Sequence, residues 1–371
     1  MFRPMELCYV ETTDRIESAA EEVASADHVE GLLIFATPAD DGYDGQLESF
    51  LERLDIPVIG GVFPELIHQN KKEQGAVVCG LTVEPQVKTV PGLSDAKADY
   101  SSQLDPDLPV DGYETVFVFV DAYATEIERF IQSLFRTYGV ELNYLGGGAG
   151  SLAADQQPCL FTDEGIVQDS AVVAAISSPL NLGVRHGWEE IAGPFRVTDT
   201  DGPVVYGLDG KPAFSVYRDV VEQQTSGDLI REEFFETAKA YPFGVSRMNG
   251  EPVVRDPFEI VEENGLRCFG DVPEGEFVHI LEGDAPTLIQ AAQSAADEAQ
   301  STQRNTEVLF FFDCISRELY LQEEYQQELT SVKTDGTQMA GALTIGEIAN
   351  DGNGHLDYYN KTAVIGAIAD I

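Results

Sequence analysis

The chain opens with short hydrophobic runs that alternate with polar loops and with segments of helical spacing. Residues 31–35 are an apolar run, residues 46–54 have apolar positions at helical spacing, residues 56–61 run into two glycines, and residues 75–83 are apolar again. Short apolar runs bounded by turn residues are typical of buried strands, and a period near 3.6 indicates a helix. The pattern predicts the order strand, loop, helix, strand, glycine turn, strand.

The same order recurs further along the chain. An apolar run begins at Thr115, a helical segment follows, a second strand runs into the glycines at 146–150, and a last strand begins at Ser170. Phe117 lies 84 positions after Leu33, and Gly146 lies 86 positions after Gly60. Self-similarity at a fixed period indicates a repeated structural unit.

A third, more divergent copy is predicted at the end of the chain. It has a strand at 307–312, a loop at 313–318, a helix at 319–329, a glycine element at 339–347 and a last strand at 362–369. The leading strands of the first two copies end in the polar segments TPADD and DAYATE. Ligands collect at the carboxyl edge of strands in open α/β sheets, although Asp and Thr also occur there as helix N-caps.

The remaining segments complete the expected architecture. Residues 84–112 are polar and rich in Pro and Gly, which indicates a long exposed connection. Residues 193–212 have the pattern of a β-hairpin, 212–223 and 285–300 read as helices, the second of them capped by Asp284, and 259–283 as a β-meander. We expect an α/β class, or α+β, with mixed sheets of repeated strand-helix-strand units. Two domains are predicted, 1–210 with two internal repeats and 211–371.

The net charge of the chain limits the classes of partner that it is expected to bind. There are 65 Asp and Glu against 22 Lys and Arg, for a formal net charge of -43, and the two halves carry -21 and -22. A nucleic-acid binder or a protein of anionic membrane surfaces needs a basic footprint, so neither partner is expected. An even surplus of carboxylates with few Lys is typical of a surface hydrated in concentrated salt, which indicates a halophilic source; an ordinary acidic protein is the alternative.

Other motifs exclude further classes of function. The five cysteines are far apart, with no metal-ligand spacing, and fit a reducing cytoplasm. No apolar stretch approaches the ~20 residues of a membrane span, so a cytoplasmic protein without membrane insertion is expected. HExxH, GxSxG and the Walker phosphate loop are absent from the sequence, and no metal or cofactor is expected.

The densest group of candidate ligand-binding residues lies near the C-terminus. A thiol, a guanidinium, carboxylates and an amide at strand ends could enclose a small polar ligand, with Arg holding a carboxylate and Glu an ammonium group. An ion pair between Arg317 and Glu347 that ties two loops together explains the same residues. The candidates are Cys314, Arg317, Glu324, Gly346, Glu347, Asn360 and Thr362. Secondary candidates are Gly60, Gly61, Gly146, Gly147, His186 and Trp188, the last either a pocket wall or a packing anchor.

These motifs, taken in order, resemble the FIST domain proteins over roughly residues 28–352, with a tail to 365. The resemblance rests on Cys314-Ile-Ser-Arg317, Glu323-Glu324, Gly346-Glu347-Ile348 and Asn360-Lys-Thr362, and in the first half on Ile59-Gly60-Gly61, Gly146-Gly147 and His186-Gly187-Trp188. Tyr359 stands where the family usually has His. FIST domains occur in bacterial and archaeal sensory proteins, so an archaeal halophile is the expected source.

The resemblance implies a small-ligand-binding sensory module in signal transduction. Amino acids or related metabolites have been proposed as ligands of the family, which is often joined to kinase, cyclase or chemotaxis output domains. The printed sequence leaves no room for an output domain, so we expect signalling through a separate partner, such as a kinase or chemotaxis component, or through oligomerisation. The alternatives are an enzyme acting on a small amine or carboxylate, with Cys314 or Glu347 in the chemistry, and a purely structural interaction protein.

Overall fold

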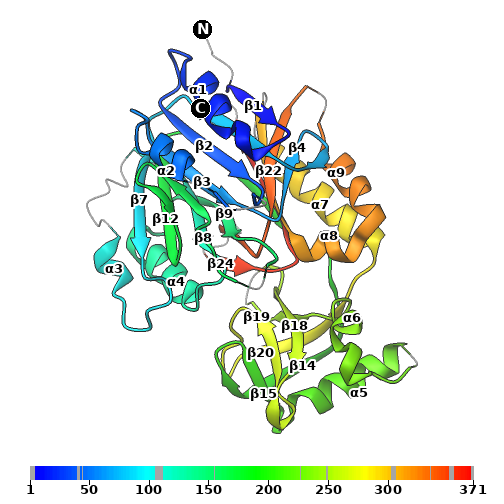
Figure 1. Cartoon of the computed structure of the whole chain (residues 1–371). Helices are drawn as coiled ribbons and strands as arrows, with labels where there is room; N and C mark the ends of the chain where they lie inside the picture. Colours follow the sequence, from blue (N-terminus) through cyan, green and yellow to red (C-terminus); the bar gives the residue numbers. More distant parts are fainter. Residues whose placement is uncertain are drawn as a thin grey trace.

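The computed structural model describes residues 5–39, 42–43, 45–104, 112–153, 155–225, 227–247, 250–301, 306–334, 336–350 and 355–368. In this part of the chain, three mixed six-stranded sheets form a body, and a fourth, antiparallel sheet forms a smaller unit below it (Figure 1). The α/β class with mixed sheets and two domains is confirmed. Among the described residues, no helix is long and apolar enough to cross a bilayer.

Each sheet of the body is built around one sequence repeat. In spatial order the first contains β1 (Leu7–Val10), β6 (Ala76–Leu81), β2 (Gly31–Ala36), β3 (Val58–Val62), β10 (Leu160–Thr162) and β11 (Gly165–Val167). The second contains β7 (Gln86–Pro91), β12 (Ser170–Ile176), β8 (Thr115–Asp121), β9 (Asn143–Ala149), β23 (Glu347–Asn350) and β24 (Leu356–Tyr359). The third contains β13 (Leu180–Arg185), β25 (Ala363–Ile368), β21 (Val308–Cys314), β22 (Gln338–Thr344), β4 (Glu65–His68) and β5 (Lys71–Glu73).

The three repeats share one pairing scheme. In each, the leading strand runs parallel to the second strand and antiparallel to the last, as β2 does with β3 and β6. The third repeat predicted from sequence is thus confirmed. Its helical segment starts earlier than expected, because β21 continues to Cys314 and α8 (Ile315–Leu321) follows at once; the predicted loop at 313–318 is wrong.

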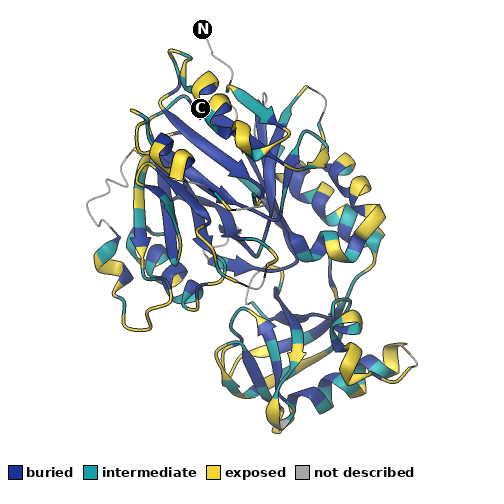
Figure 2. Cartoon of the chain, in the orientation of Figure 1, coloured by how far each residue is buried: buried dark blue, intermediate teal, exposed yellow. Residues whose placement is uncertain are grey.

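The helices fill the crossovers and cover the outer faces of the sheets, so the central strands are buried, whereas the edge strands β5 and β7 are partly exposed (Figure 2). Those of the body, besides α8, are α1 (Ile16–Ala24), α2 (Gly45–Leu51), α3 (Tyr100–Gln103), α4 (Ile127–Tyr138), α7 (Ala285–Gln300) and α9 (Tyr325–Val332). Helix α7 begins as predicted, with Asp284 and Thr287 forming a capping box. The long exposed connection predicted over 84–112 contains strand β7 and the short helix α3 where it is described.

The hairpin that follows the second strand of each repeat pairs with a strand of a neighbouring sheet. The β10–β11 hairpin of the second repeat pairs with β3 of the first, β23–β24 of the third pairs with β9 of the second, and β4–β5 of the first pairs with β22 of the third. This cyclic exchange interlocks the repeats. No repeat completes its sheet without the next one, so the body should fold as one unit.

Three phenylalanines, one from each leading strand, meet where the sheets converge. Phe35, Phe119 and Phe312 make mutual edge-to-face contacts with centroids 5.4 to 5.9 Å apart. Their register partners on the second strands are the small residues Gly61, Gly147 and Ala342, which leave room for the rings. Edge-to-face aromatic packing stabilises beyond the burial of area alone.

The smaller unit is a barrel inserted into the third repeat, between β13 and α7. It contains β14 (Glu189–Asp201), β20 (Phe277–Glu282), β17 (Phe243–Val245), β18 (Val253–Ile260), β19 (Leu266–Phe269), β15 (Val204–Leu208) and β16 (Lys211–Pro212). The sheet closes because β14 pairs with both β20 and β15. Helices α5 (Ala213–Thr225) and α6 (Phe234–Ala238) pack their apolar residues into its core. The predicted boundary at residue 210 falls between the paired strands β15 and β16 and stays a prediction.

A glycine in each second strand allows the close strand contact on which the sheets depend. A Cβ added to Gly60 would lie 1.9 Å from the Ile34 carbonyl oxygen, and Gly60 also has φ +141°. The equivalent residues Gly146 and Gly341 face Val118 and Phe311 oxygens at 1.9 and 1.8 Å. A side chain at any of the three positions would push paired strands apart.

We therefore predict that Gly60→Ala lowers the free energy of unfolding by several kcal/mol, on the order of 3 or more, because of the clash and the strained φ. Urea unfolding followed by circular dichroism measures the change. The control is Gly45→Ala at the start of α2, where an added Cβ meets nothing within 4 Å. It should leave stability unchanged or slightly raised. Equal effects of the two substitutions would contradict this account of the glycines.

Candidate functional site

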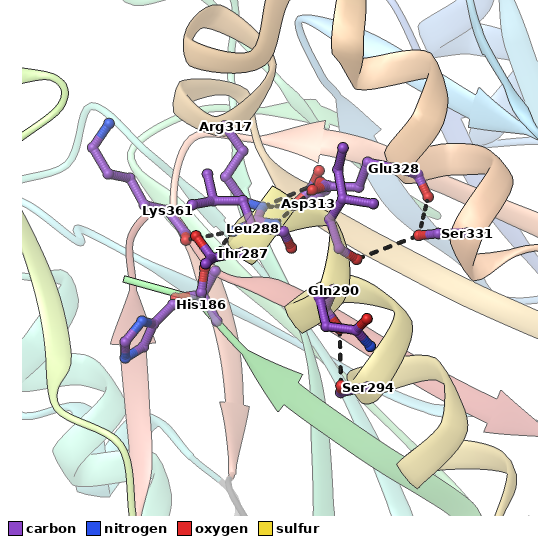
Figure 3. A network of polar contacts seen from close by, with 12 residues as sticks. His186, Thr287, Leu288, Gln290, Ser294, Asp313, Arg317, Glu328, Ser331 and Lys361 are labelled. Carbon is purple, nitrogen blue, oxygen red and sulfur yellow. Dashed lines mark hydrogen bonds and ion pairs between the residues drawn. The ribbon is translucent and has the colours of Figure 1, made fainter. Parts of the chain in front are cut away.

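Arg317 lies on the first turn of α8 and is completely buried. Its Nη1 donates to the backbone oxygens of His186 (2.7 Å) and Lys361 (3.2 Å), and its Nη2 donates to the backbone oxygen of Leu288 (2.9 Å). Its Nε and Nη2 also bond Glu328 at 3.2 and 2.6 Å. All five N–H donors of the guanidinium are therefore used within the protein (Figure 3).

Two buried carboxyl groups face Arg317. Glu328 makes the bidentate contact, and Asp313 Oδ1 lies 3.1 Å from Nε. The pKa of Asp313 is raised well above its ordinary value, first by burial and then by the negative charge of Glu328, so Glu328 carries the charge that balances the guanidinium and Asp313 favours its neutral form. The ion pair with Glu347 considered from the sequence is wrong, because Asp313 and Glu328 are the partners.

Cys314 and Glu347 form a second buried cluster. Glu347 Oε1 accepts from Thr344 Oγ1 at 2.8 Å, and Oε2 accepts from the backbone N–H of Thr362 at 3.2 Å. Burial raises the pKa of Glu347 to about 8, partly offset by these hydrogen bonds. Burial and the nearby Glu347 also raise the pKa of the Cys314 thiol, so the thiolate needed by a nucleophile is disfavoured.

Cys314 occupies the place held by Thr37 and Asp121 in the other repeats. The backbone N–H of Gly75 donates to Thr37 Oγ1 at 3.0 Å, and that of Asp169 donates to Asp121 Oδ2 at 2.7 Å. The backbone N–H groups near the Cys314 thiol, at Lys361 and Ser316, act to lower its pKa against the effect of burial. The side chains of Thr37 and Asp121 are thus held within their repeats. Asp121 is not the N-cap of α4, which is residue 126.

The other C-terminal candidates are less closely grouped. Glu324 is exposed on a short 3-10 helix, away from the buried clusters. Gly346 has φ +84° and lies against the Tyr358 ring. Asn360 is buried, its Nδ2 has no hydrogen-bond partner among the described residues, and its backbone oxygen accepts from Thr362 Oγ1 at 2.8 Å. Ligand binding by these seven residues stays a prediction. The same holds for the four glycines, which lie within β3 and β9.

His186 and Trp188, by contrast, line an open crevice of about 630 Å³. We call it the body–barrel crevice. Its walls are residues 185–190, which lead from β13 into the barrel, the first turns of α7 from Pro286 to Ser294, and Glu251 with Pro252 at the start of β18. A molecule in this crevice would touch the body, the barrel and the connection between them.

The His186 ring is held in one state. Its Nδ1 accepts from the backbone N–H of Trp188 at 2.9 Å, so the neutral ring carries its proton on Nε2, 3.4 Å from Glu251 Oε2. Burial, followed by the charge of Arg317, lowers the pKa of His186 to about 3. Figure 3 shows the ring directed away from Arg317, whose guanidinium holds the His186 backbone. The ring is a neutral donor at physiological pH.

Charges of both signs surround the crevice. Arg185 is half-buried, and its guanidinium lies 2.8 Å from Glu298 and 3.8 Å from Glu251. Glu189 is exposed, and Glu190 pairs with His279 at 3.0 Å. Sequence reasoning missed Arg185, Glu189 and Glu251. The first two flank the His186-Gly187-Trp188 motif and could have been included; Glu251 approaches only through the fold.

Trp188 is a packing anchor as well as a wall. Its ring lies 5.2 Å from that of Tyr320 and its Nε1 donates to the Lys361 backbone oxygen at 3.3 Å. The Lys361 ammonium lies 5.1 Å from the same ring and is paired with Asp256 of the barrel at 3.1 Å. The crevice floor is therefore continuous with the contact between body and barrel.

Two consecutive parts of the chain match the domains of a known protein family. Residues 31–211 match the FIST N domain, and residues 213–350 match the FIST C domain. An uncharacterised protein of Methanocaldococcus jannaschii, MJ1623, is similar at 25% identity over 224 residues. The match covers 58% of this chain and 43% of the relative, so the chain spans less than half of that protein.

The raised pKa of Glu347 predicts a pH dependence of stability. A protonated Glu347 in the folded state titrates near 8, against an ordinary value of 4.5, so its contribution is complete below pH 4.5 and is lost as pH rises through 8. Glu347→Gln should remove this part of the dependence, up to about 1.4 kcal/mol per pH unit between those limits. Urea unfolding at several pH values tests it. Glu323→Gln on an exposed position is the control, and curves parallel to wild type for Glu347→Gln would contradict the assignment.

Removing the Arg317 guanidinium should be strongly destabilising. Arg317→Met leaves the Glu328 carboxylate buried without a cation and should cost about 3–5 kcal/mol in the free energy of unfolding. Adding Glu328→Leu should recover part of the loss, since the uncompensated charge is then gone. Arg136→Met, at an exposed position of α4, should cost less than about 0.5 kcal/mol. A similar small cost for Arg317→Met would show that the network contributes little.

Proposed function

The chain belongs to the FIST domain family, and we propose that it is a sensory protein whose small ligand binds in the body–barrel crevice. FIST domains are small-ligand-binding sensory domains in signal transduction. The observation that carries the proposal is the place of the crevice, bounded by the body, the barrel and the segment that joins them. A ligand acts as a signal when it binds one conformation more tightly than another. In this crevice it would favour one position of the barrel over others.

The charges around the crevice support an amino acid or a related zwitterion as ligand. The Arg185 guanidinium can bind a carboxylate bidentately, and Glu189 and Glu251 can accept from an ammonium group. The present partners of Arg185 are partly exposed carboxylates, whose ion pairs are weak and exchangeable. Trp188 and Pro252 add an apolar wall for a side chain.

The enzyme alternative has less support from the site. Cys314 and Glu347 are both fully buried and engaged with neighbouring groups. Their raised pKa values favour the neutral thiol and carboxylic acid, which are poor nucleophiles and bases. A binding protein that passes its signal to a separate partner, such as a kinase or chemotaxis component, fits these groups better.

Titration of the protein with a panel of amino acids tests the proposal. Trp188 is the only tryptophan in the sequence and lines the crevice, so its fluorescence should change as a ligand binds. We expect at least one zwitterion to give a saturable change. Arg185→Gln should weaken its binding at least tenfold, about 1.4 kcal/mol, through loss of the carboxylate contact.

Matched substitutions control for charge. Arg53→Gln and Glu232→Gln change exposed residues outside the crevice and should leave affinity within about twofold, whereas Glu189→Gln should weaken it. The proposal fails if every zwitterion leaves Trp188 fluorescence and calorimetric heats unchanged. It also fails if Arg185→Gln and Arg53→Gln bind equally well.

A further inference from the structure

A second cavity, of about 660 Å³, lies in the body and shares no residue with the body–barrel crevice. It lies beyond the carboxyl ends of β3 and β9, where Val62 and Gly150 form part of its wall. The loops that follow β2 and β8 contribute Tyr43 and Tyr123. The cavity is therefore enclosed by the first and second repeats together, at the sheet edge where α/β proteins hold ligands. Of the TPADD segment, residues 40 and 41 lie outside the described part of the chain.

The two tyrosines present aromatic rings rather than free hydroxyls. The Tyr43 hydroxyl donates to the Thr37 backbone oxygen, and its ring packs edge-to-face on Phe161 with centroids 5.5 Å apart. The Tyr123 hydroxyl lies 2.7 and 2.9 Å from the backbone oxygens of Ser151 and Ala153, which share its single donor proton. Both rings are thereby fixed in position. An aromatic ring face attracts cations.

The charge of the cavity is of one sign. Its described lining includes the carboxylates of Glu48 and Asp155 and contains no Lys or Arg. Behind the wall is the fully buried Asp121, whose oxygens accept from the Tyr123 backbone N–H (3.0 Å) and from Gln156 Nε2 (2.6 Å). Cys159, also in the wall, has its pKa raised by burial and by Asp121, so it adds no positive or reactive group. The charged side chains that an anionic ligand would meet in the described lining are all acidic.

From these contacts we propose that the cavity between the first two repeats binds a small organic cation, an ammonium compound with an apolar body. The ammonium group lies against the ring faces of Tyr43 and Tyr123 and pairs with Glu48 and Asp155. The apolar body fills the part walled by Val62, Pro158 and Ile166. A volume of about 660 Å³ is within the range that holds metabolite-sized ligands. This site is separate from the sensory site proposed above and does not depend on it.

The test compares three probes with the same body and different charge: phenethylamine, 2-phenylethanol and phenylacetate. Isothermal calorimetry on the full chain should show the amine binding at least tenfold more tightly than the alcohol, and phenylacetate most weakly. Trp188 fluorescence should stay constant, because Trp188 lies in the other site. Failure of the amino-acid titration would leave this result unaffected, so the two proposals are tested independently.

A charge-matched pair of variants locates the cation. Glu48→Gln with Asp155→Asn removes the two carboxylates of the described lining and should abolish the preference for amine over alcohol. Glu52→Gln with Asp55→Asn makes the same charge change at exposed positions just beyond α2 and should retain it. Equal affinity for the three probes, no binding of the amine, or an equal effect of the two double variants would overturn the proposal. So would an amine-dependent change in Trp188 fluorescence.

Discussion

One buried guanidinium connects most of the parts that surround the candidate site. Arg317 binds the backbone of the segment that leaves β13, of the first turn of α7 and of the segment that enters β25. These segments are far apart in sequence; the first and the last continue the paired strands β13 and β25, and the α7 turn is tied to both through Arg317. Its bonds to Glu328 also join α8 to α9. Because a buried charge is tolerated only when it is fully paired, all these contacts must form together.

The full pairing of the buried Arg317 explains why one wall of the body–barrel crevice is fixed while the charged residues around its opening are free to change partners. Arg317 holds the backbone of His186, which lines the crevice, and that of Leu288 in the first turn of α7, whereas Arg185, Glu189 and Glu251 around the crevice are at least partly exposed. The body is interlocked by strand exchange between its three repeats. The barrel is joined to the body by two short crossings of the chain, between β13 and β14 and between β20 and α7. A ligand in the crevice would bind beside these two crossings.

The sequence predicted the repeated elements well because each copy carries its own local pattern. The strand at Glu307 and the helix capped by Asp284 could be located from periodicity and capping alone. The exchange of hairpins could not be predicted, since strand partners are chosen by packing between repeats. Nor could the partners of Arg317, because Glu328 comes within reach only when α8 and α9 turn at Gln322, a non-glycine residue with φ +50°.

The candidate site residues likewise divide into those whose grouping could be predicted from the sequence and those whose surroundings depend on the fold. Cys314, Glu347 and Thr362 were grouped from sequence and do lie together, but their burial was not visible in the pattern. His186 and Trp188 line a crevice whose third wall, at Glu251, comes from the barrel. The cavity between the first two repeats follows from the strand-end loops only after the sheets are placed side by side. A halophilic source and an amino-acid ligand stay predictions.

The central claim, that a ligand in the crevice shifts the barrel relative to the body, is tested most directly by a distance measurement. Spin labels attached through cysteines at Lys211 on the barrel and Arg136 on α4, in a Cys8→Ser background, report that distance by pulsed electron resonance. A zwitterion that binds should shift or narrow the distance distribution, and Arg185→Gln should prevent the change at the same ligand concentration. Saturating ligand with an unchanged distribution would contradict the account.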